Sequence, residues 1–159
     1  MPEPGSAPRR VAAPQRCAPS PGSASPAVPP ARSRRGQAAW TAGLRAEEAA
    51  CTALQADGWT ILLRRARTAA GEIDIVARKE GGTGPALIAF VEVKARRVLS
   101  EAAAALGLRQ QHRLLDAAAI LLGGHPGWAQ ANIRFDLMLV DATGTVRRIA
   151  DAFRDERMV

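Results

Sequence analysis

Apolar residues recur along the chain with two different periods, and each period predicts one kind of secondary structure. Over residues 37–57 they fall at spacings of three, four and seven, the period of an amphipathic helix that Gly58 then ends. Glu47 falls inside the apolar stripe, whereas Glu48 points about 100° away, toward water. The stripe itself consists of Trp40, Leu44, Cys51 and Leu54.

The rest of the chain predicts strands on both sides of a second helix. A turn rich in Gly and Pro at 80–85 favours a hairpin between the second and third strands. The second helix is predicted at 108–122, where two glycines end it. The order helix, three strands, helix, two strands predicts an α/β fold in which helices flank a mixed central sheet of about five strands. The predicted strands are 59–63, 72–77, 86–95, 133–141 and 146–153.

Composition separates a tail from a domain. Residues 1–36 are rich in Pro, Ala, Ser, Gly and Arg and have few large apolar side chains, which predicts a disordered tail before one domain at 37–159. The tail holds six Arg and one Glu, or +5 of the net charge of +7, which leaves 7 − 5 = +2 for the domain. The domain is therefore only mildly basic, and its charge is weak support for nucleic-acid binding.

Several classes of protein are excluded or disfavoured. The chain is 47% hydrophobic, and none of its apolar stretches approaches the roughly 18 residues of a membrane span, so we expect a soluble protein that does not enter a membrane. Two Cys without a pattern indicate no disulfide framework and fit a cytoplasmic location, and two His make a zinc site of the usual kind improbable. No Gly-rich loop with Lys-Ser/Thr suggests small-molecule phosphotransfer.

Charged residues interrupt the third predicted strand. Because strand side chains alternate between the two faces of a sheet, Val91 and Val93 point one way while Glu92 and Lys94 point the other. An acid and a base therefore share one face of a strand that is otherwise apolar.

A second acid interrupts the preceding strand. The same rule places Asp74 opposite both of its apolar neighbours, Ile73 and Ile75. If the two strands pair antiparallel, facing side chains lie about 5 Å apart, so Asp74 and Glu92 can share one ion. Two such carboxylates repel unless a cation lies between them, and Mg²⁺ or Mn²⁺ fits oxygen ligands.

The other charged residues fit the same hypothesis. Lys94 would orient the nucleophilic water and stabilise charge on a phosphate, and Glu47 would act as a further ligand or an outer acceptor. The alternative is purely structural: Glu92 and Lys94 form an ion pair, and Asp74 ends a strand on an exposed face. The spacing alone does not separate these two interpretations.

Five motifs together resemble the bacterial YraN family over about residues 37–155. Its members are predicted to have the restriction-endonuclease-like fold of the PD-(D/E)xK nuclease superfamily, related to Holliday-junction resolvases and tRNA-splicing-endonuclease-like domains. The motifs are Gly43-x-x-Ala46-Glu47-x-x-Ala50, Gly58-Trp59-x-Ile61-Leu62, Gly71-Glu72-Ile73-Asp74, Phe90-Val91-Glu92-Val93-Lys94-x-Arg96 and Arg134-Phe135-Asp136.

The resemblance implies a role for each residue of the candidate site. It makes Asp74 and Glu92 the metal-binding acids, Lys94 the catalytic lysine and Glu47 the helix-borne acid. The expected cofactor is Mg²⁺ or Mn²⁺, and the expected fold is a restriction-endonuclease-like core with the element order given above.

Four arginines are candidate contacts to nucleic acid. The resemblance indicates Arg67 and Arg96 as phosphate contacts. Arg109 and Arg113 share one face of the second predicted helix and can also reach phosphates, although a solvated helix face is equally compatible with the pattern.

Four further positions bear on the site. Arg65 stands where the family usually has Asn, and Gln110 where it usually has Lys, which puts substrate contacts and rate in doubt more than metal binding. Arg134 and Asp136 share a strand face, and we expect them to pair with each other rather than to supply a third ligand.

These features favour a metal-dependent endonuclease that hydrolyses phosphodiester bonds in DNA, including branched or damaged structures. Two alternatives stay open: a catalytically silent nucleic-acid-binding or assembly protein on the same fold, and a nuclease acting on RNA. The sequence does not decide between DNA and RNA, because phosphate contacts carry no base information. A homodimer is also left open.

Overall fold

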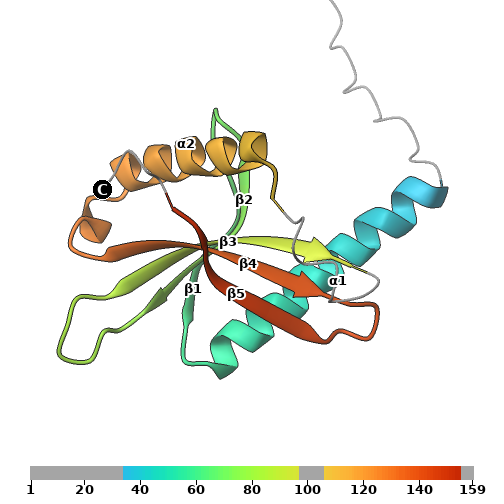
Figure 1. Ribbon diagram of the computed structural model, residues 1–159, viewed down its shortest axis with the longest axis horizontal. Coiled ribbons are helices and arrows are strands. Elements are labelled where there is room, and N and C mark those ends of the chain that lie inside the picture. Colours follow the sequence, from blue (N-terminus) through green and yellow to red (C-terminus); the bar gives the residue numbers. More distant parts are fainter. Residues whose placement is uncertain (1–33, 97–105, 155–159) are drawn as a thin grey trace, which may run out of the picture. The chain divides into compact units, whose positions relative to one another are not determined.

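Two α-helices, one short 3-10 helix and five strands make up the part of the chain that the computed structural model describes, residues 34–96 and 106–154 (Figure 1). Residues 34–36, predicted as the end of the disordered tail, are instead the first residues of α1; the rest of the predicted tail lies outside the described residues, so its disorder stays a prediction. The elements are α1 (Arg34–Ala56), β1 (Thr60–Arg67), β2 (Glu72–Lys79), β3 (Leu87–Ala95), α2 (Leu108–Gly124), η2 (Pro126–Trp128), β4 (Asn132–Val140) and β5 (Val146–Phe153).

The strands form one mixed sheet in the order β1-β2-β3-β4-β5. Strands β1, β2 and β3 are an antiparallel meander, β3 and β4 are parallel, and β5 is antiparallel to β4. A parallel pair needs a crossover connection, and α2 lies in that connection. The α/β class, the element order and the mixed five-stranded sheet predicted from the sequence are confirmed, with β1 four residues longer than the predicted segment at its C-terminal end.

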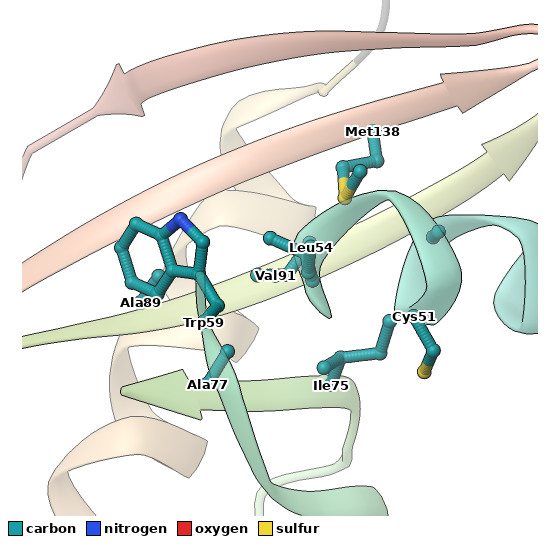
Figure 2. Close-up of a cluster of buried hydrophobic side chains, with 9 residues drawn as sticks. Cys51, Leu54, Trp59, Ile75, Ala77, Ala89, Val91 and Met138 are labelled. Atoms are coloured by element: carbon teal, nitrogen blue, oxygen red, sulfur yellow. The ribbon is translucent and has the colours of Figure 1, made fainter. Parts of the chain in front are cut away.

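The two helices cover different faces of the sheet and bury two apolar clusters. Ala50, Cys51 and Leu54 of α1 pack on side chains from β2, β3 and β4, together with Trp59 (Figure 2). The second cluster joins α2 to the other side chains of the same strands and includes Phe90. The first part of the central strand β3, residues 87–91, is therefore apolar on both faces, as its apolar run before Glu92 predicts.

Two details of the predicted packing are wrong. Trp40 is 45% exposed, because the buried part of α1 begins only at Ala46, so the predicted apolar stripe starts too early. Ile73 and Ile75 were expected on one face but belong to different clusters. The last residue pair of β2 and β3 is Ile75 with Val91, so Ile73 lies where β1 alone holds the strand and the alternation of the central ladder does not continue.

A buried ion cluster fastens β5 to β4. The Asp136 carboxylate, whose side chain is fully buried, accepts two hydrogen bonds each from Arg134 and Arg148 and one from the backbone N–H of Asp151. Both guanidinium groups also lie over the Trp59 ring, at 5.4 and 4.3 Å from its centroid. The predicted pairing of Arg134 with Asp136 is confirmed, and Arg148 is a second partner from β5.

Among the described residues, neither α1 nor α2 combines the length and the apolar character that a membrane-crossing helix needs.

Candidate active site

Asp74 and Glu92 lie at the same end of two neighbouring antiparallel strands. The ladder between β2 and β3 ends with the pair Ile75 and Val91, and the two acids are the next residue of each strand. One Asp74 oxygen, Oδ2, accepts a hydrogen bond of 2.8 Å from the backbone N–H of Val93. The antiparallel pairing from which the shared site was inferred is therefore present.

The Glu92 carboxylate is buried and only half satisfied. Its side chain is 5% exposed. The oxygen Oε1 accepts from Lys94 Nζ at 2.5 Å and from Gln110 Nε2 at 2.8 Å. The other oxygen, Oε2, is buried and has no hydrogen-bond partner among the described residues. Such an oxygen is costly unless a cation or water satisfies it.

The pKa of the Asp74 carboxyl lies above its ordinary value. Burial above all, and next the negative charge of Glu92, raise the pKa of Asp74 to about 6. The Val93 N–H lowers the pKa, Glu47 adds a smaller upward effect, and Lys94 opposes these acids. Without a bound cation, the negative charges of Glu92 and Glu47 therefore disfavour the ionisation of Asp74 at this end of the sheet.

Glu47 lies on α1, close enough to Asp74 for its negative charge to raise the pKa of that carboxyl. Burial raises the pKa of its carboxyl, which Arg65 and Arg64 partly offset. Arg65 Nε lies 4.0 Å from Glu47 Oε2 and donates a hydrogen bond of 3.0 Å to Glu72. Arg65 adopts φ 49°, a conformation that costs free energy for a residue with a side chain. Glu47 Oε2, too, has no hydrogen-bond partner among the described residues.

These acids offer a metal ion only part of its coordination shell. Within residues 34–96 and 106–154, no three His, Cys, Asp or Glu side chains are gathered closely enough to hold one. Mg²⁺, however, commonly binds one or two carboxylates and completes its shell with water and phosphate oxygens. The unpartnered Oε2 of Glu92 beside Asp74 fits this donor set. Direct coordination by Glu47 is still a prediction.

Two of the four candidate arginines face the same hollow. Arg109 and Arg113 line a hollow of about 730 Å³ next to Gln110, and they have no ion-pair partner among the described residues. Arg113 lies against Gly71, where an added Cβ would be only 3.0 Å from two of its side-chain carbons. Gly71, with φ 150°, is thus the residue of the Gly-Glu-Ile-Asp motif that admits Arg113.

The other two arginines lie elsewhere. Arg67 is 79% exposed and pairs with Glu72 at 2.8 Å. Arg96 lines a separate hollow of about 770 Å³ that Arg45 of α1 and the turn between β4 and β5 also line. The structure therefore does not bring the four predicted phosphate contacts together.

Two neighbours of the site, Gln110 and Arg65, were visible in the sequence only as departures from a family pattern. Gln110 contacts Glu92 and Arg65 links Glu47 to Glu72, and neither contact was foreseen. The usable signal is position: Gln110 lies in the first turn of the helix that follows the strand of Glu92. No comparable signal marks Arg65.

The chain is thus an α/β protein with a pair of buried carboxylates at one end of its central strands. A model of the uncharacterised protein family UPF0102 matches residues 46–140, a segment that includes both carboxylate motifs. The chain belongs to this family, which confirms the family resemblance drawn from the motifs.

Relatives named UPF0102 proteins cover most of the chain. One from Granulibacter bethesdensis is 55% identical over 120 residues, which are 76% of this chain and 73% of the relative. Those from Azorhizobium caulinodans and Rhodopseudomonas palustris are 46% and 47% identical; each match covers 80% of this chain, and 92% and 93% of the relative.

Proposed function

We propose that this protein is a metal-dependent nuclease with a restriction-endonuclease-like core that hydrolyses phosphodiester bonds in DNA. The observation that carries the proposal is the unpartnered buried Oε2 of Glu92 beside Asp74, a carboxyl whose pKa is raised to about 6. Without a cation, Glu92 Oε2 has no hydrogen-bond partner among the described residues and the pKa of Asp74 stays raised, so binding Mg²⁺ or Mn²⁺ would relieve a cost that the fold otherwise carries.

Asp74 and Glu92 would hold the ion, and Glu47 would accept a hydrogen bond from its outer shell or bind it directly. When bound, such an ion supplies Lewis acidity, which acidifies water and polarises a phosphoryl group. Lys94 is 28% exposed and hydrogen-bonded to Glu92. Its ammonium group would orient the attacking water and stabilise the negative charge that grows on the phosphate.

The proposed substrate side of the site is the hollow lined by Arg109 and Arg113. Both guanidinium groups are free of carboxylate partners among the described residues, so they are available to phosphate oxygens. Arg67 and Arg96 would contact phosphates farther along a bound strand. Branched or damaged DNA is the preferred substrate in this proposal because of the family resemblance to resolvases.

A silent nucleic-acid-binding protein is the second candidate, and one observation favours it. Lys94 and Glu92 form an ion pair at 2.5 Å, so both charges have a structural role that needs no metal ion. This candidate predicts DNA or RNA binding that is independent of Mg²⁺, with no cleavage product.

A cleavage panel tests the proposal. Single-stranded, duplex, flapped and four-way-junction DNA and a matched RNA would be incubated with the full chain, with Mg²⁺, Mn²⁺ or EDTA. We expect metal-dependent cleavage of DNA that Asp74→Asn and Glu92→Gln abolish. Glu48→Gln is the matched control, because Glu48 is an exposed acid of α1 that pairs only with Arg64. Absence of Mn²⁺ binding in a calorimetric titration, together with absence of cleavage, would refute the proposal.

A further inference from the structure

We infer that Gln110 is a positioning residue that fixes the Glu92 carboxylate for metal binding, an inference that rests on the proposed function. Gln110 belongs to α2, the next described element after β3, and its side-chain amide donates to Glu92 Oε1 at 2.8 Å. It is the one α2 side chain with a hydrogen bond to Asp74, Glu92 or Lys94 among the described residues.

The arrangement of donors on Glu92 carries the inference. Gln110 and Lys94 donate to the same oxygen, Oε1, one from a helix and one from the strand. No donor among the described residues reaches Oε2, which is buried. Two donors from different elements fix both the position and the rotation of a carboxylate, so the second oxygen is held in one direction. Outer hydrogen bonds of this kind orient metal ligands and raise affinity.

The amide side chain suits this task because it donates without a charge. A second ammonium beside Lys94 would add positive charge next to the proposed cation site and weaken cation binding. Gln110 can hold Glu92 without that repulsion. The helix turn that carries it is itself fixed, since the backbone N–H of Gln110 bonds the Gly107 carbonyl at 2.9 Å.

A merely structural role would have a different signature. If Gln110 only satisfies a buried oxygen, its loss should lower the free energy of unfolding and leave the metal affinity of the folded protein unchanged. If it positions Glu92, its loss should weaken Mn²⁺ binding by about tenfold, within the range typical of outer-shell partners.

The experiment compares Gln110→Leu with Gln111→Leu in the full chain. Gln111 is the matched control: the same residue type, one position later, with its amide bonded to the Leu106 carbonyl at 2.9 Å rather than to the site. Calorimetric titration with Mn²⁺ and urea unfolding without metal would be measured for both. We expect Gln110→Leu to lose about tenfold in affinity and Gln111→Leu to stay within about twofold of the wild type.

A double variant sharpens the test, because Lys94 shares the oxygen. In the Lys94→Ala background Glu92 keeps a single donor, so Gln110→Leu should cost more Mn²⁺ affinity there than it does alone. If the wild type binds Mn²⁺ and Gln110→Leu leaves the affinity unchanged in both backgrounds, the inference is wrong and the proposed function still stands. A wild type that neither binds Mn²⁺ nor cleaves overturns both.

Discussion

The two groups of buried carboxylates in this sheet differ in how completely the fold satisfies them. Asp136 accepts five hydrogen bonds, from two guanidinium groups and one backbone N–H. Glu92 accepts two on one oxygen and none on the other among the described residues, and its neighbour Asp74 has a pKa raised to about 6. Both groups are charged side chains on central strands, yet among the described residues only Asp136 has a full set of partners.

This difference separates a structural role from a functional one. A buried charge with a full set of partners holds strands together, whereas a buried charge lacking a partner points to a ligand. The contrast predicts opposite responses to neutralisation: loss of the charge should lower the free energy of unfolding at Asp136 and raise it at Asp74 in the metal-free protein.

Asp136→Asn should have the largest effect. Neutralising this carboxylate leaves Arg134 and Arg148, 23% and 19% exposed, facing each other without the charge that balances them. Breaking a buried ion pair by removing one partner typically costs about 3 to 5 kcal/mol. Urea unfolding should show a loss of this size, with Mn²⁺ affinity of the folded fraction unchanged. Wild-type stability in this variant would contradict the structural assignment of the cluster.

Asp74→Asn should instead stabilise the metal-free protein above pH 6. The folded state retains a proton on Asp74 to about pH 6, while the unfolded chain loses it near 3.8, so stability from this group falls as pH rises between these values. The gain from Asn should approach roughly 3 kcal/mol at pH 8 and vanish near pH 4. Thermal unfolding at both pH values, in EDTA, measures the difference.

Saturating Mn²⁺ supplies the control for Asp74. Metal and proton compete for the same carboxylate, so Mn²⁺ should remove the downward slope in the wild type and have little effect on Asp74→Asn. Equal slopes for the two proteins in EDTA would show that Asp74 ionises without difficulty, and the contrast with Asp136 would then be lost.

Lys94→Ala should reduce the cleavage rate by about 100-fold while leaving Mn²⁺ affinity within a few-fold of the wild type, because the loss of a donor to Glu92 is offset by the loss of a positive charge beside the proposed cation site. Lys94→Arg should not restore the rate, because a guanidinium is bulkier than an ammonium and stays protonated. Rates on a substrate that the wild type cleaves, set beside calorimetric affinities, separate the two effects. Cleavage by Lys94→Ala at the wild-type rate would exclude the proposed mechanism.

The smallest effect concerns Arg109 and Arg113, which have no carboxylate partner among the described residues. Arg109→Gln with Arg113→Gln should weaken binding to a duplex about tenfold and make its salt dependence shallower by about 0.9 for each lost phosphate contact. Arg154→Gln is the control, since Arg154 already pairs with Asp151. Binding isotherms at several salt concentrations give both numbers; a shift equal to that of the control would remove these residues from the substrate side.

The local sequence pattern was enough to predict the helices and strands and to place Asp74 and Glu92 on neighbouring strands. The turn at 80–85 and the Glu92 and Lys94 alternation depend on neighbours in sequence, and the structure reproduces both. The faces of Ile73 and Ile75 did not follow, because the pairing of β2 with β3 ends at Ile75 and does not include Ile73. A strand's alternation is reliable only along a continuous ladder.

Tertiary partners were beyond the sequence. Arg148 reaches Asp136 from β5, and Gln110 reaches Glu92 from α2, across sequence separations that no period encodes. The sequence likewise gives no sign that Arg65 adopts φ 49°, since the surrounding structure imposes this conformation. The acids of the site and the ion pair of Glu92 with Lys94 could therefore be read from the strand pattern, whereas the partners from α2 and β5 could not.

The sheet order also has a consequence for folding kinetics. Strands β1, β2 and β3 are consecutive and antiparallel, so they can pair by local loop closure, whereas β4 joins β3 in parallel only after the α2 crossover has formed. Asp74 and Glu92 would then face each other early, before Gln110 or the Asp136 cluster is in place. Neutralising Asp74 should accelerate folding, and Asp136→Asn should mainly accelerate unfolding, in stopped-flow measurements.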